Sequence, residues 1–197
     1  MRAVIQAVSS ASVRVNGGEP ESIGPGLVIL LGVRDTDTLD IVPKLADKCA
    51  GLRIFPDEEG KLNLSARDLG YSALVVSQFT LYGNTRKGYR PSFIKAAKPP
   101  LSVDAYELFL AEMNGQGLKE VRHGEFGADM QVSLVNEGPC TIIIDTDEWK
   151  NKERARCRHF ISRRRRRCTP TPFCSSRTPA MESSSTRQQM PRAITGS

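Results

Sequence analysis

Histidine and tryptophan are scarce in this sequence, and several motifs that define common chemistries are missing. Two histidines and one tryptophan occur in 197 residues, and only His123 precedes residue 150. A Ser-His-Asp or Cys-His mechanism would have to use His123, which stands at an expected strand end and is more typical of a solvated imidazole. The patterns G-x-x-x-x-G-K-S/T and H-E-x-x-H are absent, and no G-x-G-x-x-G follows a strand, so no P-loop, dinucleotide or zincin site is indicated.

Long apolar runs are missing as well. The longest, Gly26–Val33, falls far short of the roughly 18 residues of a membrane span, and the first residues lack the basic-then-apolar pattern of a secretory signal. We therefore expect a cytoplasmic protein that does not contact a membrane. Five cysteines do not indicate a disulfide framework, and Cys49 and Cys140 are predicted to be small core hydrophobes. The other cysteines and the second histidine show no recognised zinc spacing: Cys157, His159, Cys168 and Cys174.

Charge divides the chain into two parts. Residues 1–150 hold 16 basic and 20 acidic side chains, whereas residues 151–197 hold 12 basic and 2 acidic ones, a net charge of +10. The second part contains no Leu or Val and is rich in Arg, Ser, Thr and Pro, so it cannot build a core of its own. We predict one globular domain over residues 1–150 and a basic, disordered tail over residues 151–197. The run Arg163–Arg167 would attract any polyanion.

Hydrophobic periodicity predicts a strand-rich, mixed α/β domain with two helices. The run Gly26–Val33 is typical of a strand buried on both faces, and apolar spacing predicts a helix from about Thr38 to Ala50. A second helix is expected from Ser102, as N-cap, to a stop at Gly115. The other expected strands are Ala3–Val8 and Ser12–Val15, separated by a Ser-Ser turn, Leu52–Phe55, Leu74–Thr80, Gln131–Val135 and Cys140–Ile144. These strands are too few for a doubly wound fold.

Two polar stretches are not explained by this assignment. In Ser77–Gly83, polar residues interrupt an apolar strand just before a loop rich in Arg, Lys and Gly. Polar groups at a strand end can face a ligand, but alternation on a half-exposed strand explains them equally well. On composition alone, Asn136–Thr141 is typical of a hairpin turn between two strands. Neither stretch identifies a function by itself.

Longer segments, taken in order along the chain, carry a resemblance to a known family. They read MRAVIQAVSSASV, IGPGLVILLGV, LRIFPDEEGKLNLS, LVVSQFTLYGNTRKGYRPSF and GEFGADMQVSLVNEGPCT. Through them the chain from Met1 to about Asp145 resembles the D-aminoacyl-tRNA deacylase (D-tyrosyl-tRNA deacylase) family, with both signature motifs, SQ-x-T and N-x-G-P-x-T, intact. The resemblance implies a partly antiparallel, barrel-like sheet with two helices packed on it, assembled as a homodimer. The tail falls outside it.

The resemblance implies an esterase that proofreads translation by hydrolysing the bond between a D-amino acid and the 3′-terminal adenosine of tRNA. An aminoacyl ester is already activated, so it needs a positioned water and donors aimed at the developing oxyanion more than it needs a strong base. A domain with one histidine fits this requirement. No metal or organic cofactor is implied. Glycyl-tRNA is an expected second substrate, because glycine has no side chain to exclude.

The resemblance also implies roles for particular residues. It places four in the catalytic site: Ser77, Gln78, Phe79 and Thr80. Backbone N–H groups near Phe79 and Thr80 would stabilise the oxyanion, and the terminal 2′-hydroxyl of the tRNA would handle the proton. The alternative is Thr80 as nucleophile, which ranks second because the sequence identifies no base beside it. Phe126 and Met130 match positions near the pocket in the family.

The Gly138–Pro139 motif is implied to set the chiral selection. In the family this peptide bond is cis, and each subunit inserts the motif into the active site of its neighbour. Its carbonyl oxygens would occupy the space into which an L side chain projects, so that the wrong enantiomer is excluded. Side-chain identity should then matter little.

One departure from the family and one basic segment concern charge near the site. Ala7 stands where the family usually has an Arg that braces the Gly-Pro element. Either a cation such as Arg53, Arg86 or Arg90 replaces that brace, or the motif is held less firmly.

Arg86, Lys87 and Arg90 follow the SQFT stretch and are expected to contact phosphates of the tRNA acceptor end, plain solvation being the alternative.

Two other functions stay open on the sequence. One is a non-catalytic RNA-binding module that keeps the fold and uses the arginine-rich tail, although the intact motifs argue against it. The other is a small-molecule D-amino acid esterase with Thr80 as nucleophile, which would cleave simple D-amino acid esters as well as charged tRNA. Deacylation of matched D- and L-tyrosyl-tRNA distinguishes these functions.

Overall fold

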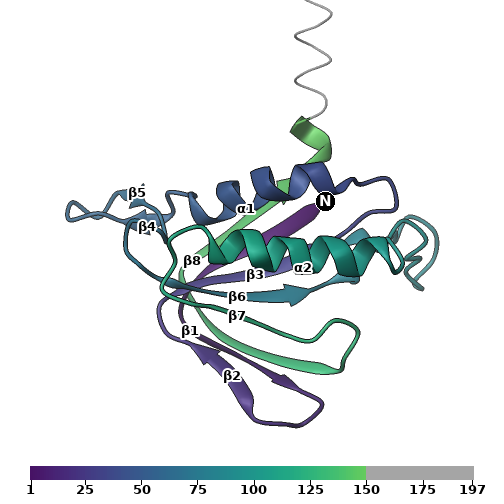
Figure 1. Cartoon of the computed structure of the whole chain (residues 1–197), viewed down its shortest axis with the longest axis horizontal. Coiled ribbons are helices and arrows are strands. Elements are labelled where there is room, and N and C mark those ends of the chain that lie inside the picture. The colour runs from purple at the N-terminus through teal and green to yellow at the C-terminus, as the bar shows by residue number, and fades with distance from the viewer. Residues whose placement is uncertain (150–197) are drawn as a thin grey trace, which may run out of the picture. The chain divides into compact units, whose positions relative to one another are not determined.

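The computed structural model of the chain describes residues 1–149, and the predicted tail, residues 151–197, lies outside them. Two helices, α1 (Val42–Ala50) and α2 (Leu101–Asn114), lie side by side on one face of a strongly curved sheet (Figure 1). Two short 3-10 helices, η1 (Leu39–Ile41) and η2 (Phe79–Tyr82), lie before α1 and after β6. The strands are β1 (Arg2–Val15), β2 (Pro20–Ile23), β3 (Gly26–Gly32), β4 (Phe55–Pro56), β5 (Leu62–Leu64), β6 (Ser72–Ser77), β7 (Val121–His123) and β8 (Met130–Asp145).

The main sheet is built around β1. Its order is β2-β1-β3-β6-β7, and β8 also pairs with β1. β1 is antiparallel to β2, β3 and β8, whereas the β3–β6 and β6–β7 pairings are parallel. β3 pairs with the first half of β1, and β2 pairs with its second half. The sheet therefore curls into a nearly closed, barrel-like form (Figure 1). The predicted fold class is confirmed.

The structure of β1 and β8 contradicts two predictions made from the sequence. The Ser-Ser turn expected near residue 10 is absent, because both serines are exposed positions inside the continuous strand β1. The hairpin expected at residues 136–139 is also wrong, because these residues lie inside the continuous strand β8. Gln6 pairs with Thr141 and Val8 with Asn136, so four residues of β8 face Ala7 alone. This is an enlarged β-bulge, which bends a strand and pushes its extra residues outward.

Apolar side chains fill two separate cores on the two faces of the sheet. Ala3, Ile5 and Ala7 of β1 belong to the core beneath the helices, whereas Val8 and Val13 belong to the other core. The alternation of β1 therefore changes face between Ala7 and Val8, at the position of the bulge. A single strand thus contributes to both cores because its pairing shifts register in the middle.

Both predicted helices are confirmed, with small differences at their ends. α1 begins at Val42 with Pro43 in its first turn, where a missing N–H costs nothing, and it ends before a glycine. α2 begins at Leu101, so Ser102 lies inside the helix and does not cap it, while the stop at Gly115 is as predicted. Cys49 of α1 is buried, which raises the pKa of its thiol to about 12, in keeping with a core hydrophobe.

Candidate active site

The end of β6 positions the SQFT segment. β6 is almost entirely buried, and its last residue, Ser77, pairs with Leu31 of β3. The N–H of Gln78 donates to the carbonyl oxygen of Leu31 at 2.7 Å, after which the chain turns into η2. The residues Ser77–Thr80 consequently lie at the carboxyl edge of the parallel strands, where ligands commonly bind in sheets of this kind.

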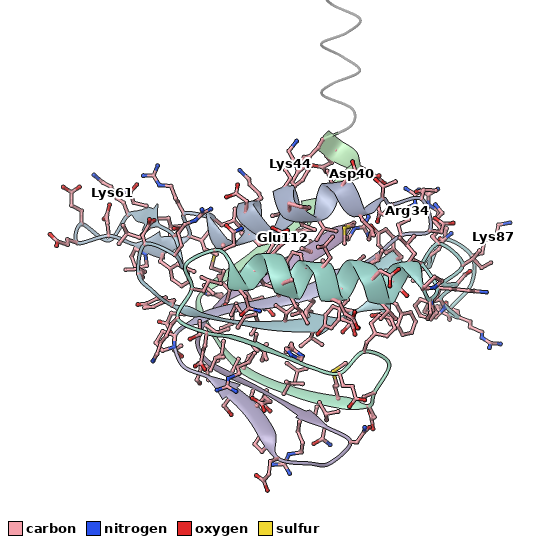
Figure 2. All side chains as sticks on the ribbon, viewed as in Figure 1. Arg34, Asp40, Lys44, Lys61, Lys87 and Glu112 are labelled. Carbon is pink, nitrogen blue, oxygen red and sulfur yellow. The ribbon has the colours of Figure 1, made fainter. Side chains whose placement is uncertain are left out.

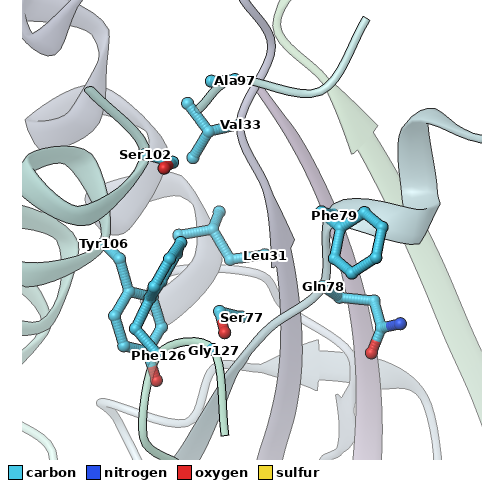
Figure 3. Close-up of a pocket in the computed structure, with 10 residues that line it drawn as sticks. All are labelled: Leu31, Val33, Ser77, Gln78, Phe79, Ala97, Ser102, Tyr106, Phe126 and Gly127. Carbon is cyan, nitrogen blue, oxygen red and sulfur yellow. The ribbon is translucent and has the colours of Figure 1, made fainter. Parts of the chain in front are cut away.

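A narrow cavity of about 80 Å³ opens beside this segment (Figure 3). Its walls come from the end of β3, the SQFT segment, the first turns of α2 and the loops before α2 and β8. The lining residues are Leu31, Val33, Ser77, Gln78, Phe79, Ala97, Ser102, Tyr106, Phe126 and Gly127. Apolar walls with a few polar groups are typical of small-ligand sites.

Tyr106 holds the far wall of this cavity in place. Its hydroxyl lies 3.0 Å from the carbonyl oxygen of Val75 and 3.1 Å from that of Gly124, so α2 is tied both to β6 and to the segment before Phe126. The Tyr106 and Phe126 rings lie 6.0 Å apart between centroids. Burial raises the pKa of Tyr106 well above its usual value, so the residue stays neutral and acts as a positioning group.

The polar groups of the SQFT segment are arranged for donation rather than for base catalysis. The N–H groups of Phe79 and Thr80 open η2, so no preceding helical carbonyl is available to them. The Thr80 hydroxyl accepts a hydrogen bond from the side-chain amide of Gln78. An amide donor cannot take a proton from this hydroxyl, and no carboxylate or imidazole bonds it within residues 1–149.

The structure brings together some of the predicted site residues and separates others. Four of them line the cavity: Ser77, Gln78, Phe79 and Phe126. Thr80 is exposed next to it on η2. Met130 is half-buried against the second core and does not line the cavity. Gly138 and Pro139 are exposed in the β8 bulge and do not line the cavity of their own chain.

The N-x-G-P-x-T motif closes the bulge with its own side chains. The Gly138–Pro139 peptide bond is cis. Asn136 Oδ1 accepts a hydrogen bond from the N–H of Cys140 at 3.1 Å, and Asn136 Nδ2 donates to Thr141 Oγ1 at 3.2 Å. The spacing of the motif thus has a local physical reason, because Asn136 and Thr141 bond across the Gly-Pro pair.

Ala7 lies opposite this bulge in β1 and is 3% exposed, so it offers no polar group as a brace. Its neighbour Gln6 donates from Nε2 to Thr141 Oγ1 at 3.2 Å. Arg53 donates instead to a carbonyl of the β4–β5 hairpin, and Arg86 lies on the loop after η2. Within the described residues, amide and hydroxyl groups hold the bulge.

The basic loop between η2 and α2 is exposed, including Arg86, Lys87 and Arg90. Arg86 lines a second cavity, whereas Lys87 and Arg90 do not. His123 is exposed at the end of β7, as expected of a solvated imidazole. In residues 1–149, no three His, Cys, Asp or Glu side chains gather where they could hold a metal ion. The helices of this part are too short or too polar to cross a membrane.

Comparison with known proteins decides the family. The family model for D-Tyr-tRNA(Tyr) deacylase matches residues 4–145. The chain belongs to this deacylase family. It is 53% identical over 146 residues to the D-aminoacyl-tRNA deacylase of Akkermansia muciniphila, covering 74% of this chain and 97% of that protein. It is 52% identical over 153 residues to that of Porphyromonas gingivalis, covering 78% and 100%.

Two solved structures share the fold of this chain. The c-Myc DNA Unwinding Element Binding Protein matches with a TM-score of 0.69 and 38% identity, over 74% of this chain and 98% of that one. A probable eukaryotic D-amino acid tRNA deacylase matches with a TM-score of 0.66 over 73% and 98%. At 17% identity, the second likeness concerns the fold alone.

Sequence reasoning missed the contribution of α2 to the cavity. The sequence predicts Ser102 as a helix cap, and no local pattern singles out Tyr106 as a residue of the site. The two are four residues apart, so they lie on the same face of α2, and both line the cavity. That spacing was visible in the sequence. The cavity that the two residues face depends on where α2 crosses the sheet, which the sequence does not state.

Proposed function

We propose that the chain hydrolyses the ester bond between a D-amino acid and the 3′-terminal adenosine of tRNA, a proofreading step of the cytoplasm. The family match and the names of the curated relatives support this activity. The observation in the chain itself is the SQFT segment, whose N–H groups at Phe79 and Thr80 lack a helical acceptor and lie beside a mostly apolar cavity. Such donors stabilise the oxyanion of an ester's tetrahedral intermediate.

In this mechanism a water molecule attacks the ester carbon while the carbonyl oxygen, becoming negative, accepts hydrogen bonds from the N–H groups of Phe79 and Thr80. The bond to the ribose 3′ oxygen then breaks, and the 3′ oxygen leaves as a hydroxyl. The neighbouring 2′-hydroxyl of the RNA relays the proton from water to this oxygen. Gln78 orients the Thr80 hydroxyl, for which the described residues provide no base.

Chiral selection in this proposal needs a second copy of the chain. Gly138 and Pro139 project from the β8 bulge outside their own cavity, a position suited to entering the site of a partner. On β8, Val135 and Ile143 are 56% and 65% exposed, and apolar side chains on such a strand favour association. The homodimer, exclusion of L side chains and acceptance of glycyl-tRNA belong together in this proposal.

Deacylation of matched D-tyrosyl-, L-tyrosyl- and mischarged glycyl-tRNA tests the function. We expect rapid release from the D and glycyl substrates and protection of the L substrate. Equal rates on both enantiomers would refute the proofreading role, and tRNA binding without release would indicate an RNA-binding module. D-tyrosine methyl ester is a further control, because hydrolysis as fast as that of charged tRNA would indicate a small-molecule esterase.

A further inference from the structure

A second cavity, of about 220 Å³, lies at the end of η2 that is farther from Phe79. Its walls come from β1, from the chain after β3, from the loop after η2 and from the chain after β8. They carry four cations, a phenol and a carboxylate: Arg2, Arg34, Arg86, Lys95, Tyr82 and Asp147. Four of the lining side chains are cationic, so this cavity differs clearly from the first one, whose walls are mostly apolar.

Lys95 is placed in this cavity by backbone pairing. Arg34 and Ala96 form an antiparallel bridge where β3 has ended. The N–H of Asp35 donates to the carbonyl oxygen of Lys95 at 3.2 Å. The segment that carries Lys95 therefore runs alongside the end of β3, which brings its ammonium group near the guanidinium of Arg34.

Arg86 is placed by a second bridge at the start of the same loop. Asn84 and Ser92 exchange two backbone hydrogen bonds, of 2.8 and 3.0 Å. The side chain of Asn84 accepts a third, from the N–H of Arg86 at 3.0 Å. The backbone beneath both cations is thus fixed, although their side chains are exposed.

Ion pairs compensate only part of the positive charge. Arg2 pairs with Asp145 at 2.7 Å, and Arg34 pairs with Asp147 at 2.5 Å and with Asp35 at 3.7 Å. Within residues 1–149, no carboxylate forms an ion pair with Arg86 or Lys95. The buried hydroxyl of Tyr82 also lacks a hydrogen-bond partner in this part of the chain. Two unpaired cations and an unpaired hydroxyl around one cavity call for an anion rich in oxygen.

We infer that this cavity binds a phosphodiester group of the tRNA 3′ end, an inference that rests on the function proposed above. Guanidinium, ammonium and phenol groups all donate to phosphate oxygens. At about 2 Å of rise per residue, Phe79 and Tyr82 lie roughly 6 Å apart along η2. An ester at Phe79 and a phosphate beyond Tyr82 are therefore close enough to belong to one RNA strand.

Two substrates with the same ester test this inference: D-tyrosyl-tRNA, which carries phosphates, and D-tyrosyl-adenosine, which carries none. We expect Lys95→Gln and Arg86→Gln each to lower kcat/KM about tenfold more for the tRNA than for the adenosine ester, the effect of one charge-assisted hydrogen bond. Lys61→Gln is the matched control, because Lys61 lies at the opposite end of the structure from Arg34 (Figure 2). It should show no such difference.

Binding of a CCA trinucleotide, measured by fluorescence anisotropy across a salt series, gives a readout that does not depend on hydrolysis. The cavity variants should bind more weakly than the Lys61→Gln protein, with a salt slope smaller by about 0.7 per lost phosphate contact. Unchanged CCA binding, equal losses on both substrates or a site saturated by inorganic phosphate alone would overturn the inference. A chain that binds CCA through this cavity but hydrolyses neither ester would refute only the proposed activity.

Discussion

The Thr80 hydroxyl is the single group on which two mechanisms differ. It accepts a hydrogen bond from Gln78 and has no base beside it in the described residues. If backbone donors and the RNA 2′-hydroxyl carry the reaction, Thr80→Ala should lose less than about tenfold in kcat, the worth of one hydrogen bond. Single-turnover hydrolysis of D-tyrosyl-tRNA measures this. A folded but inactive Thr80→Ala protein would restore the nucleophile mechanism.

The same mechanism predicts a defect that lies in the substrate rather than in the protein. A tRNA ending in 2′-deoxyadenosine and acylated on its 3′ oxygen lacks the group that relays the proton. Its hydrolysis should be slower by about a hundredfold or more, as expected for loss of general acid-base catalysis. Unchanged binding of this tRNA serves as the control. Normal hydrolysis of it would exclude the 2′-hydroxyl from the reaction.

A substitution of Asn136 tests whether its side-chain hydrogen bonds across the bulge support chiral selection. Asn136→Ala removes the acceptor of the Cys140 N–H and the donor to Thr141, each worth about 1 kcal/mol. We expect the ratio of D- to L-tyrosyl-tRNA hydrolysis to fall, because the Gly-Pro carbonyls are held less firmly. Asn114→Ala is the matched control, since its amide bonds only the exposed end of α2. A ratio equal to that of Asn114→Ala would show that the Asn136 hydrogen bonds do not contribute to chiral selection.

Among the residues of the site, those adjacent in the chain were predictable and those brought together by topology were not. Ser77, Gln78 and Phe79 follow one another at the end of β6 and the start of η2, so the break in the apolar pattern was visible in the sequence. Ser102 and Lys95 carry no local signal of their role. Ser102 lines its cavity because α2 crosses the end of β3, and Lys95 lines the other cavity because the loop before α2 crosses there as well.

At the scale of elements, the strands with strong local patterns were predicted and the two longest strands were divided in error. The apolar run of β3 predicts a strand, and the periodic apolar face of α1 predicts a helix, without information from the rest of the chain. β1 and β8 contain serines or turn residues in their middle, and they stay continuous because each is the partner of the other along almost its whole length. Pairing between residues so distant in the chain outweighs local turn propensity, and a local pattern cannot reveal it.

The packing of α2 against the core should contribute measurably to the free energy of unfolding. Phe109 is fully buried in the core beneath the helices, so Phe109→Ala should lower the free energy of unfolding by about 3–5 kcal/mol through lost burial and an unfilled cavity. Urea denaturation followed by circular dichroism measures this. Glu107→Ala, at an exposed position of the same helix, should change it by no more than about 0.5 kcal/mol. Similar losses in both variants would indicate that α2 is poorly packed.

At the scale of the whole molecule, the proposed homodimer can be tested on the exposed face of β8. Val135→Glu places a charge where apolar side chains would meet, so we expect sedimentation to show a monomer and deacylation to be lost together. Leu62→Glu is the control, because Leu62 is equally accessible but lies on the β4–β5 hairpin. An active Val135→Glu monomer would show that each site is complete within one chain.

The predicted tail, residues 151–197, is expected to act only through its charge. The family match ends at residue 145, so a chain shortened after Lys150 should fold and keep its preference for D substrates. Its affinity for tRNA should depend less on salt than that of the full chain, because fewer counterions are released. Anisotropy titrations of both proteins over a salt series measure this. A shortened protein that unfolds or accepts L-tyrosyl-tRNA would move the domain boundary into the tail.

The long pairing of β1 with β8 also sets an order of events on the ribosome. β1 is synthesised well before β8, and the last residue of β8, Asp145, lies opposite Arg2. Until that part of the chain has emerged from the exit tunnel, one edge of β1 has no strand to pair with, and an unpaired edge is a site of aggregation. The nascent chain therefore carries an unpaired edge of β1 until β8 has been synthesised, and the barrel-like sheet cannot be completed before that point.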